Sequence, residues 1–145
     1  MIALLQRVTE ARVEVAGQLR GEIGPGLLVF IGVRPDDDSA RATRLLTRLL
    51  DYRIFADEAG RMNLSLRDTG GGLLLVPQFT LAADTRSGNR PVFSTAAPPD
   101  QARALFAELL QQAHSLHQNV ASGEFGAQMQ VCLVNDGPVT FWLEA

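Results

Sequence analysis

Short apolar runs dominate the first third of the chain and predict β-strands. Residues of Ala11–Val15 alternate between apolar and charged, which is typical of a strand with one buried face. Leu27–Val33 (LLVFIGV) is apolar throughout and too short for a typical helix, which favours a strand buried on both faces. Ile2–Val8 gives a further short strand, and Gly24-Pro25-Gly26 marks a turn.

Helical periodicity appears twice. Asp36–Ser39 offers N-cap residues for a helix that runs to about Tyr52, and Asp100 offers a cap for a helix over Gln101–Leu116. The first helix carries an apolar stripe of Ala42, Leu45, Leu46, Leu49 and Leu50, and the second one of Leu105, Phe106, Leu109, Leu110 and Ala113. Each helix is therefore expected to cover one face of a sheet.

The remaining elements are strands and one long loop. Strand-like pieces are expected at Arg53–Phe55, Met62–Leu66, Leu73–Leu81, Met129–Val134 and Val139–Leu143. Pro77 cannot donate to a sheet ladder, so it marks an edge, a bulge or the end of its strand. The loop Ala82–Pro99 is long enough to be functional or mobile. Together these elements predict an α+β or layered α/β fold.

Composition limits the classes of function. The 145 residues predict a single domain over residues 1–145. Net charge is −3, and all 13 basic residues are arginine, which argues against gripping long duplexes but leaves a short nucleic-acid end open. There is no apolar run of about 18 residues, so no membrane span is expected. Arg7 interrupts the N-terminal apolar run, so we expect no secretory leader and a cytoplasmic protein.

Common catalytic signatures are absent, since the chain has no P-loop, no GxGxxG, no HExxH and no GxSxG. His114 and His117 have only Cys132 as a further soft ligand, so no metal site is expected. Cys132 is expected to be a small buried apolar residue, and a single cysteine excludes a disulfide framework. A stripe of Arg41, Arg44 and Arg48 favours a solvated face with local ion pairs, with phosphate contact as the alternative.

Two segments break local rules, which is expected at functional sites. In Pro77-Gln78-Phe79-Thr80-Leu81, a strand that ends at Pro77 would leave the amides of Gln78, Phe79 and Thr80 without ladder partners. Such amides could hold an oxyanion, although a polar strand end explains the composition equally well. In Asn135-Asp136-Gly137-Pro138-Val139-Thr140, composition favours a hairpin turn, but the glycine also permits close backbone approach to a ligand.

Together the two segments resemble the bacterial D-aminoacyl-tRNA deacylase (D-Tyr-tRNA deacylase) family, whose motifs are S-Q-F-T-L and N-x-G-P-V/F-T. The similarity extends from MIALLQRV through GEIGPGLLVFIGV, YRIF and MNL to MQVCLVNDGPVTFWLEA. The resemblance implies a three-layer α/β/β fold and a homodimer with its active sites at the subunit interface. The implied substrate is the tRNA 3′ end carrying a D-amino acid or glycine, and no cofactor is implied.

The resemblance also implies roles for individual residues. Catalysis would rest on main-chain amides near Gln78 and Phe79 and on the 2′-hydroxyl of the terminal adenosine, with Thr80 considered as a nucleophile. A cis Gly137–Pro138 dipeptide from the partner subunit would present carbonyl oxygens to the substrate's amino group and exclude an L side chain. The implied substrate-binding residues are Gly137, Pro138, Asn135, Thr140, Met129 and Arg7.

The chain departs from the family motif at Pro77, where the family has serine. We expect this change to be tolerated if only the amides act. The loop residues Asp84, Arg86 and Arg90, together with Arg7, are candidates for phosphate or interface contacts, with surface ion pairing as the alternative. Two other functions stay open: a catalytically weak tRNA- or DNA-end-binding dimer, and an esterase that uses Thr80 with His114 or His117.

Overall fold

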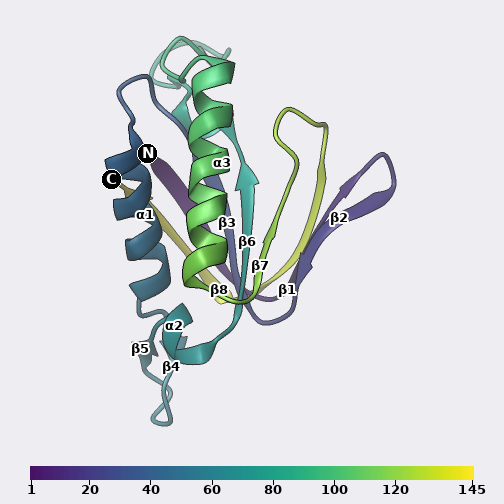
Figure 1. The fold of residues 1–145 in the computed structure, drawn as a ribbon, viewed down its shortest axis with the longest axis vertical. Helices are drawn as coiled ribbons and strands as arrows, with labels where there is room; N and C mark the ends of the chain where they lie inside the picture. Colours follow the sequence, from purple (N-terminus) through teal and green to yellow (C-terminus); the bar gives the residue numbers. More distant parts are fainter.

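Two helices lie across one face of a strongly bent six-stranded sheet in the computed structural model, which describes residues 1–145 (Figure 1). The helices are α1 (Ser39–Asp51) and α3 (Pro99–Leu116). The sheet has the order β2-β1-β3-β6-β7, with β8 paired to β1. Its strands are β1 (Ile2–Val15), β2 (Gln18–Ile23), β3 (Gly26–Gly32), β6 (Gly72–Pro77), β7 (Val120–Ser122) and β8 (Gln130–Glu144). Strand β6 is parallel to β3 and β7, and the other pairs are antiparallel.

The bend of the sheet creates a third layer and a second core. One core lies between the helices and the sheet, and the other lies between β3 and β6 on one side and the far halves of β1 and β8 on the other. In β3, Leu27, Val29 and Ile31 belong to the first core, whereas Leu28 belongs to the second. The prediction of a strand buried on both faces is therefore confirmed, as is the α/β fold class.

The expected strands at the N-terminus form one continuous element. Strand β1 pairs with β3 along its first half, with β2 along its second half and with β8 along most of its length. The pairing of β1 with β8 shifts its register between Gln6 and Val8 and again between Val8 and Glu10. Such irregularities let a strand bend while it stays in the sheet. The separation of this segment into two strands was therefore wrong.

Helix α1 begins as expected, with the Asp38 side chain accepting a hydrogen bond from the Arg41 amide at 2.9 Å. All five residues of its predicted apolar stripe are buried. Helix α3 begins at Pro99 with Pro98 as N-cap, so Asp100 lies in the first turn and the prediction of an Asp100 cap was wrong. Proline suits the first helical position because the amide that it lacks would have no partner there. Leu110 is only partly buried.

The central segments are shorter than expected. Strands β4 (Phe55–Ala56) and β5 (Met62–Leu64) form a separate small sheet. Residues Leu66–Thr69 form helix α2, which the strand prediction over Met62–Leu66 missed. A capping box between Ser65 and Asp68 starts that helix, because each side chain bonds the backbone of the other residue.

The two segments that broke local rules also differ from the simple predictions. Strand β6 ends at Pro77, and a short 3₁₀ helix, η1 (Phe79–Ala82), follows in place of the expected strand. Strand β8 runs through Asn135–Pro138 without a hairpin turn. Gln6 faces Thr140 and Val8 faces Asn135, so Arg7 alone lies opposite the four residues 136–139. These four residues form a wide bulge within the strand.

The two ends of the chain lie side by side (Figure 1). The Met1 ammonium group donates to Asp37 Oδ1 at 2.5 Å and to the Ala145 carbonyl oxygen at 2.6 Å. The side chains of Met1 and Asp37 are both fully buried. None of the helices is long and apolar enough to span a membrane.

Candidate functional site

A cavity of about 560 Å³ opens at the carboxyl end of β6, between that end and the loop that joins β7 to β8. One wall comes from Val76, Pro77, Gln78 and Phe79, and the other from Phe125, Gly126, Ala127, Gln128, Met129 and Val131. Three predicted site residues therefore meet in this cavity: Gln78, Phe79 and Met129.

The backbone at the end of β6 brings Gln78 and Phe79 into the cavity wall, and Thr80 follows them. The Gln78 amide donates to the Ile31 carbonyl oxygen at 2.8 Å, so the prediction that it is free was wrong. The N–H groups of Phe79 and Thr80 begin η1 and have no acceptor inside that helix. The pair available to an oxyanion is therefore Phe79 and Thr80, one residue later than expected.

The side chain of Thr80 does not line the cavity. Its hydroxyl oxygen accepts a hydrogen bond from Gln78 Nε2 at 2.5 Å. His117 Nε2 lies 2.6 Å from the Gly71 carbonyl oxygen, before β6 begins. Thr80 follows the other end of this six-residue strand, about 20 Å away at about 3.3 Å per residue. His117 and Thr80 are therefore too far apart to act together as a nucleophile and base.

The loop between β7 and β8 contributes site residues that the sequence pattern did not indicate. The Phe125 ring lies 6.3 Å from the Phe106 ring, and the Arg103 guanidinium lies over it at 4.7 Å. A Cβ at Gly123 would lie 2.7 Å from Met129 Sδ, so a larger residue there would displace the Met129 side chain. The available signal was an aromatic residue between two glycines, Gly123 and Gly126, ahead of a strand.

The bulge in β8 gathers a second group of predicted site residues. The Gly137–Pro138 peptide is cis, and Gly137 has a φ of 140°. A Cβ at Gly137 would lie 2.6 Å from Val139 Cγ2, so an alanine there would be strained in both backbone and packing. Arg7 holds the bulge from the neighbouring strand, with Nε donating to the Asp136 carbonyl oxygen at 3.1 Å.

Polar side chains at the base of the bulge fix its shape. Asn135 Oδ1 accepts from the Val139 amide at 2.8 Å, and Asn135 Nδ2 donates to Thr140 Oγ1 at 3.1 Å. The second guanidinium nitrogen of Arg7 donates to the Ile54 carbonyl oxygen at 2.7 Å. Arg7, Asn135 and Thr140 thus all support the Gly137–Pro138 dipeptide.

Within one chain the two groups do not form one site. None of the residues of the bulge lines the cavity at the end of β6. Two apolar residues of β8, Val134 and Trp142, lie on either side of the bulge and are 49% and 48% exposed. An exposed apolar side chain thus lies in the strand on each side of the bulge.

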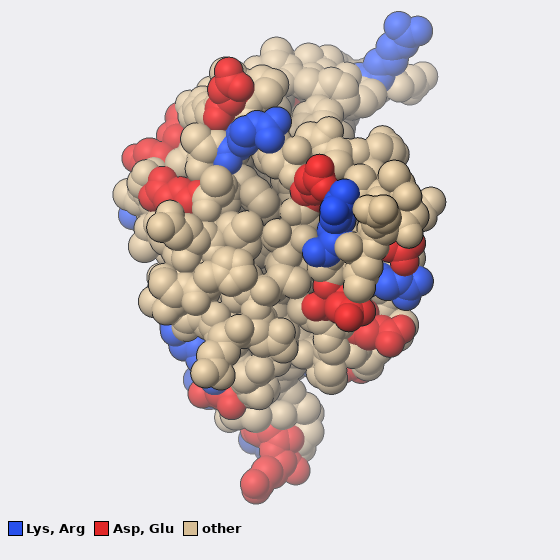
Figure 2. Space-filling model, turned by 45° about the vertical axis from the view of Figure 1, so that its right-hand side comes forward, with Lys and Arg blue, Asp and Glu red and all other residues tan.

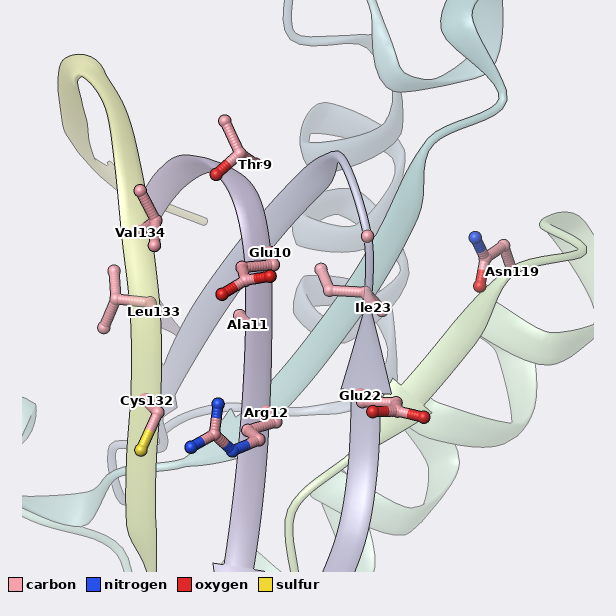
Figure 3. Close-up of a pocket in the computed structure, with 11 residues that line it drawn as sticks. Thr9, Glu10, Ala11, Arg12, Glu22, Ile23, Asn119, Cys132, Leu133 and Val134 are labelled. Carbon is pink, nitrogen blue, oxygen red and sulfur yellow. The ribbon is translucent and has the colours of Figure 1, made fainter.

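A larger cavity, of about 630 Å³, lies elsewhere and contains no predicted site residue. It is lined mainly by β1, β2 and β8 (Figure 3). Arg12 lies opposite Cys132 in the sheet, and its hydrogen bond to Glu14 raises the pKa of the guanidinium. Cys132 is half-buried rather than buried as expected. No group of three metal-ligating side chains occurs here or elsewhere in the structure.

Charged side chains of both signs are interspersed over the face shown in Figure 2, without a continuous basic patch. Of the predicted arginine stripe, Arg41 alone forms local ion pairs, with Asp36 at 2.6 Å and Asp37 at 3.3 Å. Arg48 instead donates to the Glu144 carbonyl oxygen. Arg86 pairs with Asp84 at 2.6 Å, and its hydrogen bonds hold the pKa of the Asp84 carboxyl well below its usual value. Arg90 makes no ion pair or side-chain hydrogen bond, so it is the free cation of the loop between η1 and α3.

The family model and two curated relatives that match this chain are all described as deacylases of aminoacyl-tRNA. Residues 4–144 match the family model described as D-Tyr-tRNA(Tyr) deacylase. A D-aminoacyl-tRNA deacylase from Thioalkalivibrio sulfidiphilus (strain HL-EbGR7) is 67% identical over 144 residues, covering 99% of this chain and 97% of that protein. Another from Stutzerimonas stutzeri (strain A1501) is 63% identical over the whole of both chains.

Solved structures share the fold. The structure of a c-Myc DNA unwinding element binding protein has a TM-score of 0.96 and 37% identity, covering 100% of this chain and 99% of that one. The structure of a probable eukaryotic D-amino acid tRNA deacylase has a TM-score of 0.87, with 99% of this chain and 98% of that one covered. At 18% identity, the second likeness shows the common fold alone.

Proposed function

The chain belongs to the D-Tyr-tRNA(Tyr) deacylase family, and from this premise we propose that it is a hydrolase that removes D-amino acids from tRNA. Water adds to the ester carbonyl carbon, the bond to the terminal ribose oxygen breaks, and free D-amino acid and tRNA leave. An aminoacyl ester is already activated, so this reaction needs no histidine-assisted nucleophile. We expect it to take place in the cytoplasm.

The observation that carries the proposal is the cavity at the end of β6, with Phe79 in its wall and the amides of Phe79 and Thr80 without helical partners at the start of η1. Negative charge develops on the ester carbonyl oxygen as water adds, and fixed N–H donors stabilise that charge. Gln78 stays in place because its amide is bonded to Ile31 and its side chain to Thr80. Thr80 therefore acts through its amide and its bond to Gln78 rather than as a nucleophile.

The Gly137–Pro138 bulge completes this site in a homodimer. One subunit cannot use its own bulge, because the bulge does not line its own cavity. Exposed Val134 and Trp142 on either side of the bulge supply an apolar surface for a second copy. A symmetric pairing lets each subunit give one bulge and receive one.

Selection of the D form follows from the chemistry of the bulge. Gly137 has no side chain and Pro138 has no N–H, so both offer carbonyl oxygens, which accept hydrogen bonds from an ammonium group. Once the substrate's ammonium group and ester are held, the main chain of the bulge lies on one side of the substrate's Cα atom. An L side chain would point to that side and has no room there. Glycine has no side chain to exclude, so glycyl-tRNA is also a substrate in this proposal. Asn135, Thr140 and Arg7 contribute by holding the bulge, and Met129 lines the substrate cavity.

A second candidate function is binding of a tRNA or DNA end without efficient catalysis. Two observations favour considering it. A protein of the same fold at 37% identity is named for binding a DNA unwinding element, and Pro77 replaces the serine of the family motif.

A deacylation assay on D-Tyr-tRNA, L-Tyr-tRNA and Gly-tRNA tests the proposal. We expect D-Tyr-tRNA and Gly-tRNA to be hydrolysed and L-Tyr-tRNA to be spared. Binding of uncharged tRNA without any hydrolysis would favour the second candidate. Equal hydrolysis of D- and L-Tyr-tRNA would overturn the role given to the bulge.

A further inference from the structure

Two exposed aromatic rings stand at the edge of the candidate site. Phe79 is 55% exposed and Phe93 is 43% exposed, and their ring centroids lie 5.1 Å apart at an interplanar angle of 59°. Phe79 also lines the cavity, so the Phe93 ring extends the apolar surface outward from it. We call these two rings the aromatic shelf.

The loop that carries Phe93 is fixed by backbone contacts. Asp84 and Val92 exchange two backbone hydrogen bonds, of 2.8 and 3.1 Å, and so close the loop just before Phe93. The Phe93 carbonyl oxygen accepts from the Ala96 amide, and the Ala97 amide donates to Val33 in the fold beneath. The shelf is thus held by the fold even though its rings face solvent.

The same loop carries one uncompensated positive charge. Arg90 lies inside the closed segment between Asp84 and Val92 and has no partner, whereas Arg86 is neutralised by Asp84. Arg90 belongs to the same loop as Phe93. Exposed aromatic rings together with a free cation are the combination with which proteins bind single-stranded nucleic acid, because bases stack on rings and phosphates pair with the cation.

We propose that the aromatic shelf and Arg90 bind the single-stranded 3′ end of the tRNA just before the terminal adenosine. The inference rests on the proposed function, which places that adenosine in the cavity beside Phe79. The strand then leaves the cavity over Phe79 and Phe93, with a phosphate facing Arg90. We assign this surface to a nucleic acid rather than to a second copy of the chain. The proposed dimer already uses another apolar surface, that of β8 next to the Gly137–Pro138 bulge.

The test compares two esters that share the reacting centre. D-Tyr-tRNA has the 3′ strand, and D-tyrosyl-adenosine lacks everything beyond the terminal nucleoside. We expect Phe93→Ala to raise KM for D-Tyr-tRNA by about tenfold to hundredfold with kcat retained, as loss of one stacked base predicts. The KM for D-tyrosyl-adenosine should stay unchanged in this variant. Arg90→Ala should weaken tRNA binding and lower the slope of log affinity against log salt by about 0.7.

Val92→Ala is the matched control, because Val92 is exposed on the same loop but has no ring and keeps its backbone bonds. It should leave both substrates unaffected. Equal loss on both esters by Phe93→Ala would overturn the proposal, and light scattering would then show whether the variant has lost a dimer interface. Unchanged kinetics on both esters would overturn it as well.

A binding measurement separates this proposal from the proposed function. Fluorescence anisotropy with labelled uncharged tRNA needs no catalysis. If the unaltered protein hydrolyses neither ester, the proposed function fails, but weaker tRNA binding by Phe93→Ala still supports the shelf. If Phe93→Ala and the unaltered protein bind this tRNA equally well, the shelf has no such role.

Discussion

At the scale of single residues, the Gly137 backbone forms the wall that we propose for the substrate without using a side chain. Its φ of 140° lies where glycine is favoured, and the space beside it is already filled by Val139. Arg7 contacts the same dipeptide from the neighbouring strand. The backbone conformation at Gly137, the absence of a side chain there and the position of the dipeptide are thus all set by its surroundings.

Gly137→Ala tests this point. The new Cβ would lie 2.6 Å from Val139 Cγ2 and would force the bulge to move. We expect deacylation of D-Tyr-tRNA to fall more than tenfold and stability to fall by about 1–3 kcal/mol, the usual cost of such backbone strain. Kinetics and thermal unfolding check both. Gly24→Ala is the control, since nothing lies within 4 Å of its added Cβ, and normal activity in Gly137→Ala would contradict the role of the bulge.

Pro77→Ser restores the residue of the family motif. Pro77 ends β6, and the neighbouring Gln78 amide is already bonded to Ile31. Because the proposed catalytic amides belong to Phe79 and Thr80, we expect kcat/KM to change by less than about threefold, a shift below roughly 1 kcal/mol. Steady-state deacylation measures this. A gain of a hundredfold or more would show that the serine hydroxyl takes part in the reaction and that this chain is impaired.

At the scale of elements, the groups that we propose to act lie where regular structure is interrupted. Strand β6 stops at Pro77 and leaves the first amides of η1 free of helical partners. Strand β8 continues past its bulge because β1 pairs with it on both sides. Rigid strands thus hold irregular backbone, which gives a site both exposed groups and fixed positions.

His114 lies in the last turn of helix α3 and His117 is its C-cap, and this placement predicts that both are dispensable for catalysis. The double variant His114→Gln and His117→Gln should keep deacylation within about tenfold of the original, because loss of a general base usually costs 10²–10⁴-fold. The glutamine at 117 keeps a donor for the Gly71 carbonyl oxygen. A loss beyond a hundredfold in a variant that still folds would return the esterase hypothesis.

At the scale of the whole molecule, a buried ion pair with Asp37 holds the Met1 ammonium group, which also donates to the carbonyl oxygen of Ala145 at the other end of the chain. Breaking a buried pair leaves an uncompensated charge and costs about 3–5 kcal/mol. Asp37→Asn removes the charge that faces the Met1 ammonium group. We expect the melting temperature to fall by roughly 10 °C, at about 3 °C per kcal/mol for a chain of this size.

Asp51→Asn is the matched control for Asp37→Asn. Its carboxylate pairs with Arg67 at 2.7 Å, but both side chains are largely exposed. Such surface pairs contribute at most about 1 kcal/mol. Equal melting temperatures for the two variants would show that the chain ends do not depend on the buried pair.

The proposed assembly also belongs to this scale. We expect a dimer in solution, and Trp142→Glu should shift the protein toward monomer because it places charge on the apolar stretch beside the bulge. Light scattering measures the mass, and deacylation should fall together with the dimer fraction. A fully active monomer would contradict a site that is shared between subunits.

Hydrophobic pattern by itself determined much of the fold. The two helices, their largely buried stripes and the doubly buried strand β3 follow from local periodicity, whereas the proline left an edge, a bulge and a strand end at Pro77 equally open. The motif residues of both segments were also evident from the amino-acid order alone. These features are local, because each depends on the order of neighbouring residues.

Tertiary structure decided how those segments meet. Only the register of β8 against β1 shows that residues 136–139 form a bulge rather than part of a hairpin turn, since both conformations suit the same composition. Only packing brings Phe125 and Met129 to the cavity from a loop remote in sequence. The Gln78 amide is bonded to Ile31 on another strand, whereas the amides of Phe79 and Thr80 have no helical partner. The local sequence pattern could not show this difference, because the acceptor lies far away in the sequence.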